Sequence, residues 1–306
     1  MTMALLALDI GGTTIKHALF TEAGERITAV QETPTEKTAA DNHIAAQAGT
    51  IYQAYHHSGI TGVAIASAGV VDPDTGTIVS AGYTIPGYTG TPLKQSVENS
   101  TGVPCWVEND VNCALLGELW RNHYPQQHIF CMTIGTGIGG AILINGQLYR
   151  GASFGAGEVG YVNQNGQDFQ TYANTQALIH RAADAANQPF TTGYQVVHAF
   201  RDGNPDVQNA VQLWLDGIAS ELVNINHLLK PELFIIGGGI IEGAPEFGQL
   251  LDAAFRQRLT AQQYAATALK TATLGNEAGM YGALYHYLQK EAAHGHGHSQ
   301  DDRAHV

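Results

Sequence analysis

The segment from Leu5 to Phe20, LLALDIGGTTIKHALF, constrains the fold more than any other part of the chain. Two apolar runs flank one carboxylate, Asp9, and a turn of two glycines and two threonines. This pattern predicts a strand, a tight glycine turn and a second strand. The N–H groups of such a turn can bind an anion, and a neighbouring carboxylate can hold a divalent cation. A nucleotide phosphate with Mg²⁺ would fit here, although an ordinary β-hairpin with a surface Asp would have the same pattern.

The charge of the chain argues against two classes of partner. The 306 residues carry a formal net charge of −13 and no cluster of Lys or Arg. Nucleic acids and anionic membranes are bound through basic surfaces, so we expect neither as a partner. With 44% hydrophobic residues, the chain is long enough for two domains with large cores.

The three cysteines, Cys105, Cys113 and Cys131, form no CxxC pair. We expect reduced, packed thiols, as is usual in a cytoplasmic protein. The N-terminus lacks a basic stretch and its apolar run stops at Asp9, so we expect neither a signal peptide nor a membrane span.

A second polar site is predicted where a strand meets a helix. The apolar run Val103–Val107 leads into Glu108-Asn109-Asp110, and a helical pattern follows. In open α/β sheets, ligands bind beyond the carboxyl ends of the strands, which favours a functional Asp110. The alternative is that this Asp only caps the helix.

The opening pattern is repeated in the second half of the chain. FCMTIGTGIGGAILI again has an apolar strand, a polar residue (Thr133), a Gly/Thr turn and a second apolar strand. A third glycine turn, Gly237 to Gly239, follows the buried run Glu232–Ile236. The repeat predicts a duplicated architecture of two halves, each a sheet of three strands with helices, facing a shared cleft.

Further elements follow from hydrophobic periodicity. We expect a strand over Glu25–Gln31 and one ending at the small residues Ser67 and Gly69, a loop over Ala81–Thr91 rich in Tyr and Thr, and a strand over Leu269–Leu274. The expected helices are Lys37–Tyr55, Leu93–Thr101, Thr171–Asn187, Tyr194–Arg201, Asp206–Leu229, Phe247–Leu259 and Glu277–Leu288. The last is rich in small residues, which allow close approach of another helix. Residues 292–306, including His294, His296 and His298, are expected to be a disordered tail.

Three glycine turns around an Asn-Asp pair suit phosphoryl transfer. Such a reaction needs N–H groups that grip phosphates, a carboxylate for Mg²⁺ and a base for the acceptor hydroxyl. The segments DIGGT, END, TIGTGIGG, GEVG and IIGGG together resemble the ROK family of sugar kinases and repressors, of the actin/hexokinase superfamily. The resemblance runs from about Leu6 to Tyr287.

The resemblance implies an α/β fold with two ribonuclease-H-like (actin-like ATPase) domains around a central cleft that closes on sugar and ATP. The expected N-terminal domain is 1–111 plus about 280–291, and the C-terminal domain is 112–279. Asp110 would be the general base for a sugar hydroxyl, usually the 6-OH, and Asp9 the Mg²⁺-side acid, acting through water. The implied ATP-binding residues are Asp9, Gly11, Gly12, Thr13, Thr14, Lys16, Thr133, Gly135, Thr136, Gly137, Gly237, Gly238 and Gly239. The implied sugar-binding residues are Ser67, Gly69, Tyr83, Asn109, Asp110, Glu158, Tyr161 and Gln170.

The chain departs from the family pattern after GEVG. The usual His is replaced by Tyr161, the cysteines of the family's zinc segment are missing, and its terminal Glu aligns with Gln170. A structural zinc needs four N or S ligands, so we expect none here. These departures, with an IPG-containing loop and GNEAG near the end, resemble the zinc-free β-glucoside kinases of the family.

The resemblance therefore implies an ATP-dependent kinase, with a β-glucoside such as cellobiose as favoured acceptor. Glucokinase, N-acetylmannosamine kinase and fructokinase remain alternatives, as does a sugar sensor without catalysis. The resemblance implies a homodimer, and the reduced cysteines predict a cytoplasmic location. A DNA-binding repressor is not expected, because the first phosphate motif begins at residue 9 and leaves no room for a helix-turn-helix before it.

Overall fold

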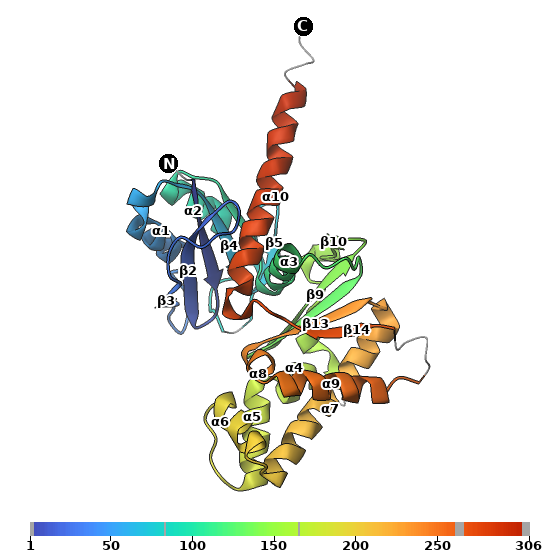
Figure 1. Ribbon diagram of the computed structural model, residues 1–306. Coiled ribbons are helices and arrows are strands. Elements are labelled where there is room, and N and C mark those ends of the chain that lie inside the picture. Colours follow the sequence, from blue (N-terminus) through green and yellow to red (C-terminus); the bar gives the residue numbers. More distant parts are fainter. Residues whose placement is uncertain (1–2, 83, 165, 261–265, 302–306) are drawn as a thin grey trace. The chain divides into compact units, whose positions relative to one another are not determined.

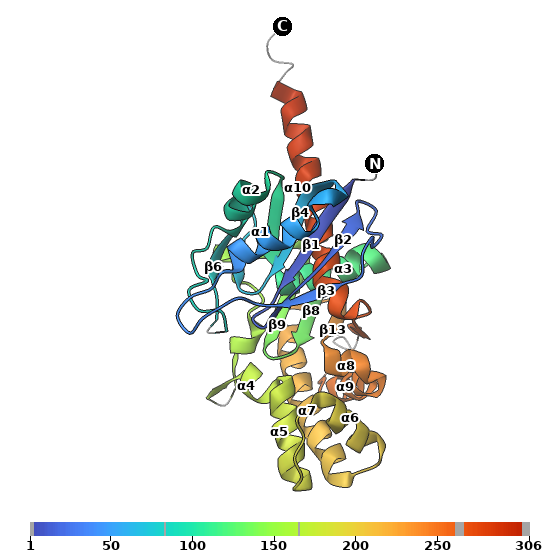
Figure 2. The same ribbon diagram turned by 90° about the vertical axis from the view of Figure 1, so that its left-hand side faces the viewer.

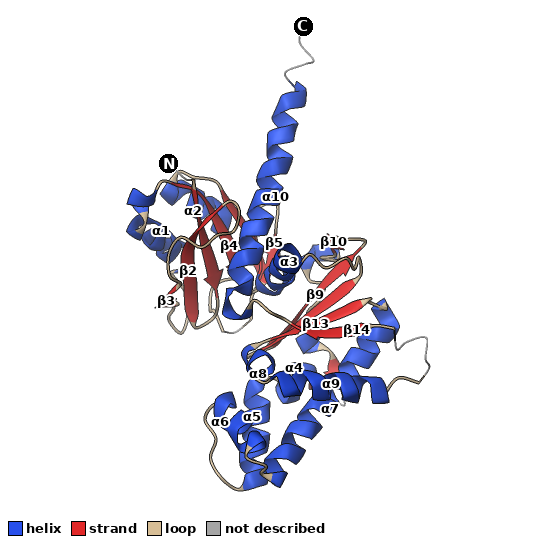
Figure 3. Cartoon of the chain, viewed as in Figure 1, coloured by secondary structure: helices blue, strands red, loops and turns tan. Residues whose placement is uncertain are grey.

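The computed structural model describes residues 3–82, 84–164, 166–260 and 266–301. They form two compact units, one of residues 1–123, 152–154 and 277–306 and the other of residues 124–151 and 155–276 (Figure 1). Each unit contains one five-stranded sheet covered by helices (Figure 3). In this part of the chain, no helix is long and apolar enough to cross a bilayer.

The first sheet has the strand order β3-β2-β1-β4-β7. Its strands are β1 (Ala4–Ile10), β2 (Thr14–Thr21), β3 (Gln31–Pro34), β4 (Ile60–Ser67) and β7 (Cys105–Asn109). The first three are antiparallel neighbours, and β4 and β7 continue the sheet in parallel with β1. A small hairpin, β5 (Val70–Asp72) and β6 (Thr77–Ser80), follows β4.

Side chains alternate between the two faces of β1, as the period of a strand requires. Leu6 and Leu8 pack with α1 (Ile44–Ala54) and α2 (Leu93–Thr101) on one face. Leu5 and Ala7 pack on the other face with α3 (Asp110–Asn122) and α10 (Ala278–Asp301) (Figure 2). A strand buried on both faces has no polar side, which explains the continuous apolar run before Asp9.

The second sheet repeats the first, with the order β10-β9-β8-β13-β14. Its strands are β8 (Ile129–Ile134), β9 (Ile138–Ile144), β10 (Gln147–Leu148), β13 (Leu233–Gly237) and β14 (Ala268–Thr271). Again three antiparallel neighbours are followed by two parallel strands. The predicted duplication is thus confirmed, and two parallel strands extend the predicted three in each sheet.

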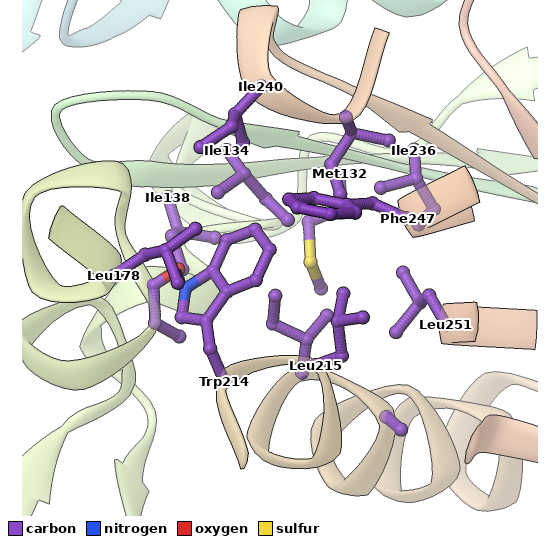
Figure 4. Packing of buried hydrophobic residues seen from close by; sticks show 14 of the residues in the cluster. Met132, Ile134, Ile138, Leu178, Trp214, Leu215, Ile236, Ile240, Phe247 and Leu251 are labelled. Carbon is purple, nitrogen blue, oxygen red and sulfur yellow. Dashed lines mark hydrogen bonds between the residues drawn. The ribbon is translucent and has the colours of Figure 1, made fainter. Parts of the chain in front are cut away.

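Helices cover one face of the second sheet with a large apolar core. They are α4 (Phe169–Ala173), α5 (Thr175–Ala186), α6 (Gly193–Arg201), α7 (Pro205–Leu229), α8 (Gly239–Gly243) and α9 (Pro245–Gln257). Figure 4 shows Trp214 of α7 and Phe247 of α9 close to Met132 and Ile134 of β8. Short 3₁₀ turns at Ala152–Phe154 and Val159–Tyr161 and a small hairpin, β11 (Asn163–Gln164) and β12 (Gln167–Asp168), precede α4.

Several predicted boundaries were wrong, each for a local reason. The third strand is Gln31–Pro34 rather than Glu25–Gln31. The segment that pairs with β2 runs from Gln31, opposite His17, to Pro34, opposite Thr14. The helix expected from Lys37 begins at Ile44, since the Thr38 hydroxyl binds the N–H groups of Ala40 and Asp41 and favours a turn. The helix expected over Thr171–Asn187 is interrupted at Asn174, which caps α5.

The two units divide the chain differently from the expected domains. Residues 112–123 group with the first unit, because α3 packs against α10 over a close approach at Gly282. We expected disorder from residue 292, but helix α10 continues to Asp301. The expected tail begins with Ala292 and Ala293, and because Ala is a strong helix former these two residues extend the helix. Residues 302–306 lie outside the described part of the chain.

Candidate active site

The carboxyl ends of β1, β4 and β7 bring the predicted residues of the first unit to one edge of its sheet. In the parallel register, Ile10 pairs with Ser67, and Ser67 pairs with Asn109. Asp9 lies one residue before this line and Asp110 one residue after it. The sheet therefore gathers a strand-end carboxylate, a hydroxyl, an amide and a second carboxylate at the edge where ligands of α/β proteins bind.

The Asp9 carboxylate lies against the first turn of α10. A Cβ atom added to Gly279 would be 2.9 Å from Asp9 Cγ and about as close to both carboxylate oxygens. Burial raises the pKa of Asp9 above its ordinary value, and the charge of Lys16 on the facing strand opposes this rise. The carboxylate is thus held in a partly desolvated position that depends on the absence of a side chain at residue 279.

The first glycine turn closes the hairpin between β1 and β2, as predicted. The N–H of Gly11 donates to the carbonyl of Thr14 at 3.0 Å, and Ile10 pairs with Ile15. A Cβ atom on Gly12 would be 3.0 Å from Cβ of Thr84. The turn therefore packs directly against the segment that begins at Thr84.

Asn109, and not Asp110, is the N-cap of α3. Its Oδ1 accepts from the N–H groups of Val111 and Asn112 at 2.9 and 3.0 Å. Its Nδ2 donates to the carbonyl of Gly69 at 3.0 Å and to Asp110 Oδ1 at 2.9 Å. Asp110 is the first helical residue, so the cap does not depend on its carboxylate.

Tyr88 belongs to this group of residues, although it was not among the predicted site residues. Its buried hydroxyl lies 2.8 Å from Oγ of Ser67. The pKa of Tyr88 is well above its usual range, mainly because the hydroxyl is buried. The negative charge of Asp110 also raises this pKa, and the hydrogen bond to Ser67 partly opposes the rise. Tyr88 therefore stays protonated and can donate beside Asp110. The sequence indicated Tyr88 only as aromatic surface in the loop over Ala81–Thr91, and Tyr83 of the same loop lies outside the described residues.

Glu108 was also missed. It is fully buried, and its Oε1 accepts from the N–H of Asn109 at 2.9 Å and from Nδ2 of Asn112 at 3.0 Å. His286 of α10 lies near its other oxygen, with Nδ1 at 4.0 Å. The signal was present in the sequence, because a carboxylate directly before Asn-Asp interrupts an otherwise apolar strand.

The second unit holds the other two glycine turns side by side. Gly237 at the end of β13 pairs with Thr133 near the end of β8. The N–H of Gly135 donates to the carbonyl of Gly137 at 2.9 Å, which closes the second turn. Gly238 has φ 116° and lies so close to Ile134 that an added Cβ would be 2.0 Å from its carbonyl oxygen, so only glycine fits there.

The start of α5 fixes the second turn. Asn174, which caps this helix, donates through Nδ2 to the carbonyl of Thr136 at 2.9 Å. The N–H of Thr175 donates to the carbonyl of Gly135 at 3.0 Å. The turn is thus held from behind by a helix terminus, which suits a turn whose N–H groups must keep a fixed direction.

The residues of the second unit that are predicted to bind the sugar, Glu158, Tyr161 and Gln170, lie in one short stretch of the chain. Cβ atoms on Gly137 and Gly160 would be 3.0 and 3.1 Å from Oε1 of Gln170, so this amide fills the space beside both glycines. Partial burial raises the pKa of Glu158. The side chain of Tyr161 is 53% exposed, which leaves its ring accessible to a ligand. Gln170 therefore lies between the second glycine turn and the GEVG segment.

Comparison with known proteins identifies the family. The model of the ROK family matches residues 5–290. A β-glucoside kinase of Klebsiella pneumoniae is 35% identical over 298 residues, which cover 94% of this chain and 97% of that protein.

Two solved structures support the same assignment. A ROK family protein from Streptococcus pneumoniae in complex with sucrose has a TM-score of 0.81 and 27% identity over 95% of this chain and 100% of its own. A ROK family glucokinase from Streptomyces griseus in complex with glucose and AMPPNP has a TM-score of 0.74 and 25% identity over 92% of this chain and 98% of its own. The enzyme class expected from the sequence, an ATP:sugar phosphotransferase, is that of these named kinases. The chain therefore belongs to the ROK family and has the α/β fold of its sugar kinases.

Proposed function

We propose that the protein transfers the γ-phosphate of ATP to the 6-hydroxyl of the non-reducing glucose of a β-glucoside such as cellobiose. The observation that carries the kinase proposal is the edge of the first sheet, where Asp9 and the first glycine turn lie at the end of β1 and Asp110 follows β7, with β4 between these two strands. The β-glucoside acceptor is supported by the Klebsiella relative and by the exposed ring of Tyr161. The sucrose complex supports an acceptor with two rings.

Asp110 is proposed as the general base. Its Oδ1 is held by the N–H of Val111 and by Nδ2 of Asn109, both at 2.9 Å. A carboxylate fixed in this way can take the proton of the acceptor hydroxyl as that oxygen attacks the γ-phosphorus in line. The hydrogen bonds orient the carboxylate before the sugar arrives, which lowers the entropic cost of the reactive arrangement.

The glycine turns are proposed to bind the phosphates of ATP. The N–H groups of Gly11 and Gly135 donate within their own turns, so the other backbone N–H groups of residues 11–14 and 133–137 would bind the phosphates, which suits oxyanions without a basic surface. Gly237 to Gly239, beside the second turn, would let the adenosine lie close to the backbone. This use of backbone donors fits a chain with a net charge of −13.

Asp9 is the residue that would hold Mg²⁺. Across the described ranges, no three His, Cys, Asp or Glu side chains are grouped closely enough to hold a metal ion. Mg²⁺ in kinases is bound by one or two carboxylates together with water and substrate phosphates, so a single carboxylate fits this ion. When bound, Mg²⁺ would neutralise part of the phosphate charge.

Replacing Asp9 by Asn should raise stability and remove activity. A carboxyl group whose pKa is raised by folding stabilises the fold most below its unfolded value of 3.8, and this stabilisation is lost as the pH rises through the folded value. At pH 7, the neutral Asn avoids the cost of a desolvated charge. Ligand-free Asp9→Asn should therefore melt above the wild type at pH 7, with the difference shrinking toward pH 4. Calorimetric melting between pH 4 and pH 8 measures this, and a lower melting temperature at pH 7 would contradict it.

A panel of acceptors tests the proposed substrate. In a coupled assay with Mg²⁺-ATP, we expect kcat/KM for cellobiose or gentiobiose to exceed that for glucose, mannose, fructose and N-acetylmannosamine by about tenfold or more, because the second ring adds binding energy. Phosphorylation at the 6-position is read from the NMR spectrum of the product. Rapid turnover of monosaccharides with none of disaccharides would exclude the β-glucoside acceptor. Calorimetric sugar binding without any transfer would indicate a sensor instead.

A further inference from the structure

Two of the three residues after β3, Thr35 and Lys37, hold the back of the first glycine turn. We call residues 35–37 the strap. The N–H of Thr35 donates to the carbonyl of Thr13 at 2.9 Å, and its hydroxyl donates to the carbonyl of Gly11 at 2.7 Å. The ammonium of Lys37 donates to the carbonyl of Gly12. The strap thus binds three consecutive carbonyl groups of the turn.

Holding these carbonyls fixes the direction of the N–H groups. In a trans peptide, the C=O of one residue and the N–H of the next point to opposite sides. The peptide bonds of the described residues are all trans. The N–H groups of Gly12 and Thr13 therefore point away from the strap, where an anion can accept from them. The Lys37 charge at the carbonyl end of the Gly12–Thr13 peptide polarises that group and makes its N–H a stronger donor.

Lys37 also binds the loop that packs against the turn, the segment that begins at Thr84. Its ammonium donates to the carbonyl of Thr84 at 2.6 Å, and the side chain of Thr84 packs against Gly12. Four residues later in the same loop, Tyr88 bonds to Ser67 beside Asp110. One lysine thus joins the turn of the first unit to the loop that carries Tyr88.

We propose that Thr35 and Lys37 are positioning residues of this kinase: Thr35 orients the first phosphate turn, and Lys37 couples that turn to the acceptor loop 84–91. The inference rests on the proposed function. Thr35 is only 8% exposed, so its hydrogen bond is shielded from water and its loss leaves the Gly11 carbonyl unsatisfied. The Lys37 side chain is exposed, so its contribution is smaller. Unlike Thr35, it bonds both to the glycine turn and to the loop that begins at Thr84, so its loss should affect the binding of both substrates.

Paired substitutions separate the two roles. Thr35→Val keeps the shape and removes the donor, whereas Thr35→Ser keeps the donor. We expect Thr35→Val to raise KM for Mg²⁺-ATP about tenfold with little change in KM for the sugar, and Thr35→Ser to restore it. Lys37→Met should raise KM for both substrates about three- to tenfold, and Lys37→Arg should recover part of this loss. The matched control is Lys290→Met, which removes an ammonium bound to Asp74 and should leave both KM values unchanged.

The same experiment distinguishes failure of this inference from failure of the proposed function. Wild-type protein that phosphorylates no sugar of the panel would overturn the function, and the strap is then tested by calorimetry with Mg²⁺-AMPPNP, in which Thr35→Val should bind about tenfold more weakly. An active wild type whose strap variants keep both KM values and nucleotide affinity would overturn the inference. So would variants that only melt at lower temperature, since a purely structural role lowers stability without changing the KM of the folded enzyme.

Discussion

Replacing Asp110 by Asn should lower kcat by about 10²- to 10⁴-fold, the usual contribution of a general base. An amide has nearly the same shape, and its Oδ1 can still accept from Val111 N–H and Asn109 Nδ2. The helix keeps its cap, because Asn109 supplies it. We therefore expect only a small decrease in the melting temperature and a nearly unchanged KM for ATP, with the loss of activity confined to kcat measured under saturating substrates.

Asp206→Asn is the matched control for this variant. Asp206 lies in the first turn of α7, a helix also capped by an Asn side chain, Asn204, and it is exposed. Both substitutions remove one negative charge from the N-terminus of a helix, which costs about 0.3–1 kcal/mol of stability. Near wild-type turnover for Asp110→Asn, or an equal loss for Asp206→Asn, would show that Asp110 is not the base.

Replacing Gly282 by Ala should have the largest effect on stability. A Cβ atom at Gly282 would lie 1.7 Å from the carbonyl oxygen of Cys113 and 2.3 Å from its carbonyl carbon. Because both atoms are backbone, α10 must move away from α3 to admit the methyl group. Overpacking of this kind costs about 1–3 kcal/mol and more in rigid sites, which exceeds the gain of about 1 kcal/mol from the higher helix propensity of Ala.

We expect Gly282→Ala to lose about 2 kcal/mol or more and to lower the melting temperature by about 4–8 °C. Activity should fall as well, because α10 also carries Gly279 against Asp9. Gly243→Ala is the control, since a Cβ atom there meets nothing within 4 Å. Thermal and urea unfolding measure both variants, and a Gly282→Ala protein as stable as the wild type would mean that the two helices are not closely packed.

Much of the fold could be predicted because its signals are local. The glycine hairpins at Gly11 and Gly135, the helix end at Gly102 and the long apolar stripe of α7 depend on neighbours within a few residues. Boundaries were wrong where side chains compete for the backbone, as Thr38 does before α1. The small residues of α10 predicted a close helix contact, which the structure confirms at Gly282, but nothing in the sequence named α3 as the partner.

The candidate site divides in the same way. The sequence alone determined two features of the site: the polar residues at the strand ends and the duplication of the glycine turn. The polar residues are Asp9, Asn109 and Asp110, and they could be read directly because a turn or a strand end is encoded by its own residues. The contacts of Thr35, Lys37, Tyr88 and Glu108 were decided only by the tertiary structure. The hydrogen bonds of Thr35, Lys37 and Tyr88 join segments that are brought together by β-sheet pairing and loop packing. The bond of Glu108 to Asn112 depends on burial within the core. Neither effect leaves a periodic signal in the sequence.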